Sequence, residues 1–256
     1  MTCGAAERLS IEGTLDRLPE SVDWIHAILR RIARVSKIPR GARILEIGAC
    51  QGRGLVALAQ EGYEAYGIEP CGEAREIAIT LKARFGVSFE IHDGVAETIP
   101  FPYGHFDVVI ATSVMEHVTD LPQSLREIHR VLKPSVVFWF NSASAMCPVQ
   151  DEIRGFPLFG WYPDSIKKRL MLWASTSHPE LIGHTKVPAL HWWTNRIARH
   201  RLRKAGFIRS WTRWELRLPH ESPPFIKSSI AIISHSRTLQ RLADTFIAGC
   251  SYAAQK

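Results

Sequence analysis

The sequence of 256 residues lacks the marks of several protein classes. It has no unbroken apolar run of the roughly 18 residues that a membrane-spanning helix needs. Its N-terminal segment carries Glu7 and Arg8 and no long apolar stretch, so it does not resemble a secretory signal. The five cysteines are scattered, without a CxxC pair or a Cys/His spacing typical of metal sites. We therefore expect reduced thiols, no metal and a cytoplasmic protein.

Acidic residues are scarce in the second part of the chain. Residues 151–256 hold 17 Lys and Arg against 7 Asp and Glu, whereas residues 1–150 hold 15 against 18. A basic half suits nucleic acid, an anionic membrane surface or a negatively charged substrate, and equally a solvated basic surface. Neither an Asn-Pro-Pro-Tyr base-methylation motif nor an RNA-binding module pattern is present, which makes nucleic acid an unlikely partner. The sequence is silent on oligomeric state.

Strand-like and helix-like patterns alternate along much of the chain. An amphipathic helix is predicted for residues 20–36, and a cofactor-binding core for residues 40–141. Apolar strands separated by helices are typical of parallel strands covered on both faces. The sequence thus predicts a single α/β domain with a Rossmann-like, doubly wound, mainly parallel seven-stranded sheet. The predicted strands are 43–47, 65–68, 87–92, 106–112, 136–141, about 207–218 and 226–234; the other predicted helices are 52–61, 73–85, 121–132, 194–205 and about 238–248.

Residues 142–194 interrupt this alternation with several prolines and seven aromatic residues. We interpret them as an insertion after the fifth strand that forms a substrate lid, with the core resuming at 195–234 and a tail at 235–256. In a predicted helix of this insertion, Ile166, Leu170 and Trp173 fall on one face with Lys167, Lys168 and Arg169 around it. Such a helix can cap a pocket for an apolar acceptor or lie at a membrane interface; an ordinary amphipathic lid is the alternative.

Two turns follow predicted strands with residues that suit a nucleotide. The first contains Glu46, Gly48, Cys50 and Gly52, where glycine allows close backbone approach and the next helix start favours an anion. Just over twenty residues later, Glu69-Pro70 places a carboxylate where it can accept from ribose hydroxyls. An NAD(P)-dependent reductase shares such turns, but the acid before the first glycine is unexpected for that class.

A third stretch, residues 92–134, distinguishes these families. It contains Asp-Gly, an Ile-Pro-Phe turn, Phe-Asp leading into the fourth strand, Glu-His after it, and Arg-Val-Leu-Lys-Pro before the fifth. In combination these residues resemble class I S-adenosylmethionine-dependent methyltransferases, particularly the group that includes ubiquinone- and menaquinone-pathway enzymes. The resemblance covers roughly residues 40–140, and Lys-Ala-Gly-Phe at 204–207 is similar to that family's entry into its sixth strand.

The resemblance implies S-adenosylmethionine as the cofactor and assigns residues to its parts. Glu46, Gly48 and Gly52 would line its methionine end, near Cys50 in the same turn. Glu69, followed by Pro70, would hold its ribose, and Asp93, Gly94 and Val95 would meet its adenine. Ser113 and Met115 would lie at the edge of the fourth strand. The sequence departs from the family at Cys50, which is usually glycine, and at Ser135-Val136, which are usually two glycines.

The acceptor side is less defined. His117 follows the fourth strand and could remove a proton from an attacking hydroxyl, although it could equally only shape the pocket. His184 and His191, with Trp161 and Tyr162, are the candidate acceptor residues in the insertion.

We therefore expect methyl transfer to oxygen or carbon of a small-molecule, glycan or lipid-linked acceptor, with peripheral contact at an anionic inner membrane face as a further expectation. The alternatives are an NAD(P)-dependent reductase, a nucleic-acid-directed enzyme, and an inactive methyltransferase-like binding protein.

Overall fold

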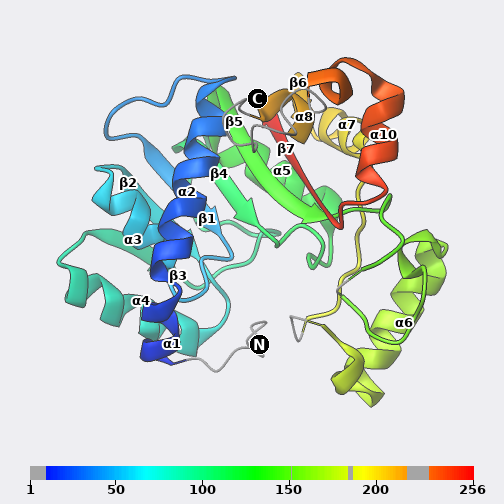
Figure 1. Ribbon diagram of the computed structural model, residues 1–256. Helices are drawn as coiled ribbons and strands as arrows, with labels where there is room; N and C mark the ends of the chain where they lie inside the picture. The colour runs from blue at the N-terminus through cyan, green and yellow to red at the C-terminus, as the bar shows by residue number, and fades with distance from the viewer. Residues whose placement is uncertain (1–9, 151, 184–186, 218–230) are drawn as a thin grey trace.

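The computed structural model describes residues 10–150, 152–183, 187–217 and 231–256. At its centre lies a seven-stranded sheet with the order β3-β2-β1-β4-β5-β7-β6 (Figure 1). Its strands are β1 (Arg43–Ile47), β2 (Glu64–Ile68), β3 (Phe89–His92), β4 (Phe106–Thr112), β5 (Leu132–Ala143), β6 (Arg209–Thr212) and β7 (Gly249–Gln255). The neighbouring strands are parallel except for β7, which runs antiparallel to both β5 and β6. The predicted Rossmann-like, mainly parallel seven-stranded sheet is confirmed.

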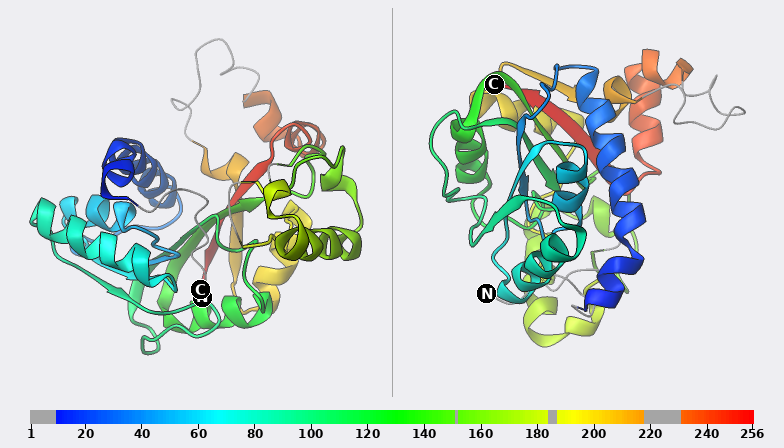
Figure 2. Two further views of the ribbon diagram at one scale, coloured as in Figure 1. Left: turned by 90° about the horizontal axis from the view of Figure 1, so that it is seen from below. Right: turned by 90° about the vertical axis from the view of Figure 1, so that its left-hand side faces the viewer.

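Helices cover both faces of the sheet (Figure 2). On one face lie α2 (Leu18–Ala33), α3 (Arg53–Gln60) and α4 (Gly72–Phe85), and on the other lie α5 (Leu121–Val131) and α7 (Asn195–Lys204). In α2, Ile25, Ile28 and Ile32 are spaced to form one apolar stripe, and each is at most 1% exposed. The outer elements are α1 (Ile11–Asp16), α8 (Arg213–Leu216) and α10 (Arg237–Asp244).

The strand register places the predicted cofactor residues at one edge of the sheet. Ile47 of β1 pairs with Ile68 of β2 and with Ala111 of β4, and Ile68 pairs with His92 of β3. The residues that follow these strands therefore emerge level with one another. This edge includes the junction of β1 and β4, where the direction of winding reverses and open α/β sheets bind ligands.

The C-terminal part of the core differs from the prediction. The strand predicted for 207–218 ends at Thr212, because the Glu215 carboxylate accepts from the N–H and hydroxyl of Thr212 and caps α8 there. The strand predicted for 226–234 is wrong for its described part, since residues 231–235 are helical. The seventh strand is instead β7, in the segment predicted as a tail. Its small residues form a strand because β5 and β6 pair with both of its edges.

The insertion at 142–194 has a small core of its own, formed around Phe159, Met171 and Trp192. It contains η1 (Phe159–Trp161), α6 (Asp164–Ser177) and η2 (Pro179–Leu181). Figure 1 shows this lobe beside the end of β5, away from α3 and α4. Among the described residues, no helix combines the length and apolar character needed to cross a membrane.

The predicted apolar face of α6 is wrong. Ile166 and Trp173 are 46% and 42% exposed, whereas Lys167 is 1% exposed and lies on the buried side with Met171 and Ala174. The Lys167 ammonium lies 4.2 Å from the centre of the Trp192 ring and pairs with Asp164 Oδ1 at 2.8 Å. These two partners compensate for burial of the charge and leave the apolar side chains outside.

Candidate cofactor and acceptor site

Two glycines let the turn after β1 fit closely against its neighbours. Gly48 and Gly52 have φ angles of +70° and +75°, in the left-handed region that suits glycine. A Cβ added at Gly48 would lie 2.5 Å from Val114 Cγ2, and one at Gly52 would lie 2.6 Å from Ala78 Cβ. The turn thus lies directly against the loop that follows β4, and neither position has room for a side chain.

Cys50 lies between these glycines and also has a left-handed backbone, with φ +48°. This conformation is unfavourable for a residue with a side chain. Burial raises the pKa of its thiol to about 11, so the thiol is neutral near pH 7 and poorly nucleophilic. The Cys50 N–H donates to Glu69 Oε2 at 3.0 Å. Cys50 thus contributes its backbone to the site, in a conformation that glycine would adopt more easily.

The Glu69 carboxylate joins the turns after β1 and β2. Besides Cys50, it accepts from the N–H of Cys71 at 2.9 Å, across Pro70. Two backbone donors fix the orientation of this carboxylate, which is only 9% exposed. Each oxygen keeps further acceptor capacity, because a carboxylate accepts about four hydrogen bonds. A ribose with adjacent hydroxyls matches this capacity.

Arg75 links the loop after β3 to the turn after β2. Its Nη1 donates to the Glu69 carbonyl at 2.6 Å and pairs with Asp93 Oδ1 at 3.2 Å. The side chain of Asp93 is 74% exposed, so its carboxylate is open to a ligand. Gly94 lies against Ile68, and Val95 begins the turn that follows.

Glu46 and Arg53 are ionisable neighbours near the first turn, Glu46 buried and Arg53 half-buried. Burial, opposed by the Arg53 charge and aided by the Glu69 charge, raises the pKa of Glu46 to about 8. A Cβ at Gly54 would lie 2.4 Å from Glu46 Oε2, so this glycine makes room for the carboxyl. Glu46 Oε2 and Arg53 Nη1 are both buried, and neither has a hydrogen-bond partner within the described parts of the chain.

Arg53 was not among the residues predicted for the site. The sequence did indicate a role for it, because Arg53 is the first residue of a helix that follows Gly52, and a helix start favours anions. A guanidinium with an unused buried donor at that position fits a ligand carboxylate.

The loop after β4 is held by the end of β5. Ser113 has a φ of +52°, its N–H donates to Asn141 Oδ1 at 3.0 Å, and Asn141 Nδ2 donates to Ser113 Oγ at 3.3 Å. Ser113 is exposed at this edge, in agreement with its predicted position. Met115, predicted as its companion, is fully buried in the main core and presents no surface to a ligand.

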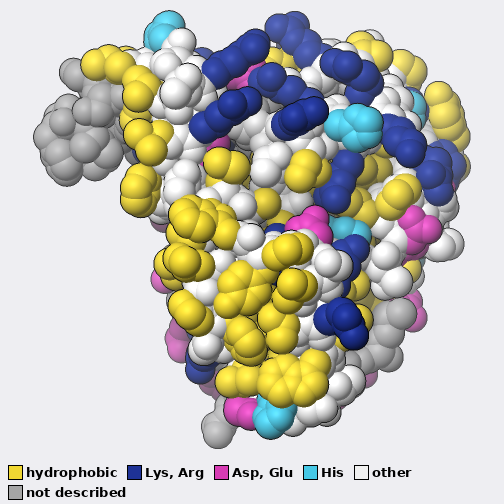
Figure 3. All heavy atoms as spheres, turned by 90° about the vertical axis from the view of Figure 1, so that its right-hand side faces the viewer, with side chains coloured by type: hydrophobic (Ala, Val, Ile, Leu, Met, Phe, Trp, Pro, Cys, Tyr) yellow, Lys and Arg dark blue, Asp and Glu magenta, His cyan; other side chains and the backbone are white. Residues whose placement is uncertain are grey.

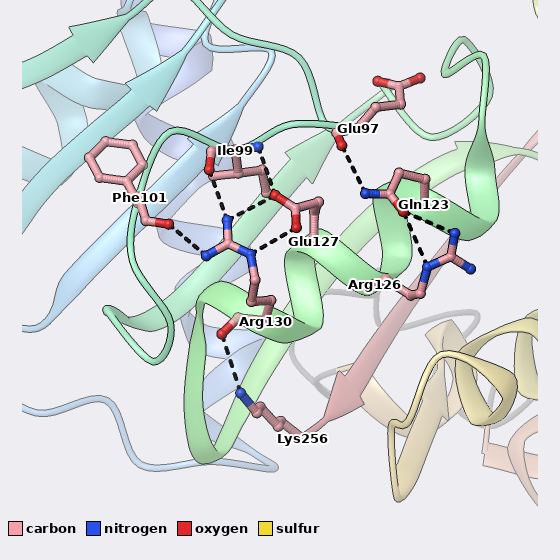
Figure 4. A network of polar contacts seen from close by, with 8 residues as sticks. All are labelled: Glu97, Ile99, Phe101, Gln123, Arg126, Glu127, Arg130 and Lys256. Carbon is pink, nitrogen blue, oxygen red and sulfur yellow. Dashed lines mark hydrogen bonds and ion pairs between the residues drawn. The ribbon is translucent and has the colours of Figure 1, made fainter.

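A polar network clamps the loop between β3 and β4, which carries Asp93 to Val95, onto α5 (Figure 4). The Arg130 guanidinium binds both Glu127 oxygens and donates to the carbonyls of Ile99 at 2.9 Å and Phe101 at 2.7 Å. This hydrogen bonding to Arg130 lowers the pKa of Glu127, so the clamp is ionised near pH 7. Gln123, Arg126, Glu97 and Lys256 complete the network.

His117 and His191 both lie where the insertion meets the loop after β4. The N–H groups of Leu190 and His191 donate to the Glu116 carbonyl, and the His191 ring bonds the Val118 carbonyl through Nε2 at 2.9 Å. Burial, aided by nearby Lys168 and Arg201, lowers the pKa of His191 to about 4. His191 is therefore neutral and serves to attach the insertion to the core.

The His117 ring lies close to the backbone carbonyls of Val187 and Pro188. Both ring nitrogens are buried without a hydrogen bond of good geometry, and burial lowers the pKa of the ring although the carbonyls of Val187 and Pro188 oppose this. His117 is thus a neutral imidazole at the boundary between core and insertion. Because both nitrogens are buried, an acceptor can reach them only if neighbouring residues move.

The other predicted acceptor residues are not brought to this boundary. Trp161 is 58% exposed and donates to the Met146 carbonyl, and Tyr162 packs on Phe159 inside the insertion. His184 lies outside the described residues. A hollow of about 810 Å³ also lies in the insertion, lined by residues such as Gln150, Arg154 and Phe156, rather than at the glycine turns. The strand ends, not this hollow, carry the groups that suit the cofactor.

The reductase alternative would need a Tyr-x-x-x-Lys pair for proton transfer, and the sequence contains this spacing at Tyr252 and Lys256. Tyr252 is 2% exposed within β7, and Lys256 donates to backbone carbonyls of Arg130 and Leu132. These residues lie on a strand, with the tyrosine buried, and do not form a proton-transfer pair beside the glycine turn. This arrangement offers no support for the reductase alternative.

Residues 45–140 match the protein family described as "Methyltransferase domain". The matched segment, 96 of the 256 residues, is similar to that family's domain. An uncharacterized methyltransferase of Bacillus subtilis, YcgJ, is 33% identical to the chain over 92 residues, or 36% of each protein. A ubiquinone biosynthesis O-methyltransferase of Azorhizobium caulinodans is 33% identical over 105 residues, or 40% of this chain and 41% of that protein. The matches thus span about two-fifths of these relatives.

Solved structures extend the likeness in fold beyond that domain. The structure of YcgJ from Bacillus subtilis has a TM-score of 0.52 at 18% identity and covers 90% of this chain and 95% of its own. An S-adenosylmethionine-dependent methyltransferase from Mesorhizobium loti has a TM-score of 0.58 at 14% identity, covering 93% of this chain and all of its own. At such identities the likeness shows only that most of this chain, including the part after residue 140, has the same fold as these structures.

Proposed function

We propose that this chain transfers the methyl group of S-adenosylmethionine to an acceptor that reaches it between the loop after β4 and the insertion. The observation that carries the proposal is the set of groups at the ends of β1 and β2. An oriented carboxylate at Glu69, a guanidinium at Arg53 with one unused buried donor, and two closely packed glycines lie at one sheet edge.

Each of these groups suits one part of the cofactor. Arg53 would hold the methionine carboxylate at the start of α3, while Glu46 would face the positively charged end of that moiety. Glu69 would accept from the ribose hydroxyls, and Asp93 from the exocyclic amine of the adenine. When bound, the cofactor supplies a methyl group on a positively charged sulfur that departs as a neutral thioether.

For transfer, the chain's own task is alignment and exclusion of water. Positioning of two reactants alone can contribute about 7–11 kcal/mol to lowering a barrier. In this proposal the insertion, which is attached to the loop after β4 through Glu116 and Val118, would close over the methyl group. A neutral His117 can accept a proton from an oxygen acceptor once neighbouring residues move aside.

The O-methyltransferase among the relatives supports an oxygen acceptor, and the apolar insertion supports a small-molecule or lipid-linked one. Incubation with deuterium-methyl-labelled cofactor and extract fractions, followed by mass spectrometry, identifies the acceptor and the atom methylated.

Calorimetry tests the cofactor site directly. Glu69→Ala and Arg53→Ala should each weaken S-adenosylmethionine binding at least about tenfold, because a buried charged or polar partner is left unpaired. Glu76→Ala and Arg84→Ala, which remove exposed charges from α4, are the matched controls. Unchanged affinity in both site variants would remove these residues from the site. Binding of NAD(P) in place of S-adenosylmethionine would overturn the proposal as a whole.

A further inference from the structure

Exposed apolar side chains are concentrated on the insertion. Of the twelve large hydrophobic side chains that are exposed in the described residues, six lie between residues 149 and 173. We call these six the apolar patch. Its members are Val149 (66% exposed), Leu158 (51%), Trp161 (58%), Ile166 (46%), Leu172 (51%) and Trp173 (42%). A set of this size exceeds the scattered single residues that are normal on a soluble surface.

Figure 3 shows the face of the molecule that carries the insertion. Hydrophobic side chains gather over its lower part, and Lys and Arg side chains gather above them on the same face. The patch includes a recess, because Val149 and Leu158 also line the hollow of about 810 Å³. The two kinds of surface are thus adjacent but separate.

Helix α7, which lies above α6 in Figure 1, contributes several exposed basic side chains. The sequence of α7, NRIARHRLRK, contains five Lys and Arg residues and no acidic residue. Arg196, Arg199, Arg203 and Lys204 are exposed, and Arg199 has Glu215 as a distant ionic neighbour at 3.8 Å. On α6, Arg169 is exposed as well, whereas Lys167 is buried and takes no part.

We propose that this face docks on an anionic membrane surface, with the apolar patch entering the interface and α7 lying against the lipid head groups. Tryptophan favours the boundary between water and hydrocarbon, which suits Trp161 and Trp173. Basic side chains beside an apolar face are the pattern of interfacial proteins that select anionic lipid. This inference is independent of the proposed methyl transfer.

The charges favour lipid over the other occupants of an apolar patch. A second copy of this chain would bring two strongly basic surfaces together, which like-charge repulsion opposes. A nucleic acid would match α7 but would leave the exposed leucine and isoleucine side chains without partners. An anionic bilayer satisfies both surfaces at once.

The test is co-sedimentation of the full chain with vesicles of phosphatidylcholine alone and of phosphatidylcholine mixed with phosphatidylglycerol. We expect binding to the mixed vesicles only, weakening as salt rises. Arg196→Gln/Arg203→Gln should lower the partition coefficient about fivefold for each charge removed. Leu172→Ser/Trp173→Ser should lower it about tenfold or more, because apolar area no longer enters the interface.

Two matched controls lie on the other side of the molecule. Ile79→Ser and Arg84→Gln remove an exposed apolar side chain and an exposed charge from α4 and should bind vesicles like the native chain. Thermal unfolding of every variant verifies that the fold is retained. Equal binding to both vesicle types, or unaltered binding of both the α7 variant and the apolar-patch variant, would overturn the proposal.

Two further results would each replace the membrane with another partner. A dimer in sedimentation that disappears in Leu172→Ser/Trp173→Ser, without vesicle binding, assigns the face to a second copy. Binding to RNA that depends on Arg196 and Arg203 but not on Leu172 and Trp173, without vesicle binding, assigns it to nucleic acid.

Discussion

Glu46 offers a sharp test of the site, because its ionisation should be visible in the stability of the protein. Burial raises the pKa of this carboxyl from 4.5 to about 8. Between these values the folded protein keeps a proton that the unfolded chain has released. The unfolded state therefore binds fewer protons, and the free energy of unfolding falls as pH rises through this window. At about 1.4 kcal/mol for each pKa unit, the loss between about pH 5 and about pH 8 is about 3 kcal/mol.

Glu46→Gln removes this titration while keeping the shape of the side chain. The variant should therefore gain about 3 kcal/mol relative to the native chain between about pH 5 and about pH 8, whatever constant cost the buried amide imposes. Urea unfolding of both proteins across this range gives the difference directly, because the other groups titrate alike in both. Parallel stability curves would show that Glu46 is already ionised in the folded state, and the reasoning from its burial would be wrong.

Glu46 should also make cofactor binding release protons. The ammonium and sulfonium groups of S-adenosylmethionine favour an ionised carboxylate, so binding near pH 7 should expel the Glu46 proton. Calorimetry in two buffers with different ionisation heats measures this release. We expect it in the native chain and not in Glu46→Gln. Proton release of equal size in both proteins would assign it to another group.

Two further predictions concern Cys50 and His117. Cys50→Gly should retain or tighten cofactor binding, because glycine accepts a φ of +48° without the roughly 1 kcal/mol penalty of a side chain. Cys50→Val should weaken binding. Tighter binding by the valine variant in calorimetry would contradict this prediction. His117→Ala should lower kcat with little change in cofactor affinity. In the native chain, activity should be lost only at pH values below the usual imidazole pKa, because burial lowers the pKa of His117. His26→Ala, which removes a half-buried histidine from α2, is the control. Full turnover by His117→Ala would leave His117 a structural role only.

The parallel core of the sheet could be read from the sequence, because its strands are apolar and separated by turn residues. The predictions of β1 and β4 match the structure residue for residue, and both are buried on two faces. β7 was missed because Gly249, Ser251 and its alanines give little strand signal, and its pairing depends on distant residues. Local pattern does not reveal such tertiary pairing.

The site, like the fold, could be predicted only in part. The turns holding Gly48, Glu69 and Asp93 follow their strands directly, so their shared edge follows from the parallel sheet. The burial of Lys167 could not be predicted, because it depends on Trp192, a residue far along the chain that packs beneath it. The closeness of Val187 and Pro188 to His117 equally depends on how the insertion packs.

The position of β7 has a consequence for how the chain folds. Until β7 arrives, one edge of β5 is unpaired, and β5 carries the fully buried sequence Val137-Phe-Trp-Phe140. Its partner residues, such as Gln255 opposite Val137, follow it by more than 100 positions. Pairing over such a separation is slow, because a long loop must close before any contact compensates for the lost entropy. During synthesis, then, an apolar edge stays open while the whole insertion is made, and this edge is where we expect misfolded chains to associate.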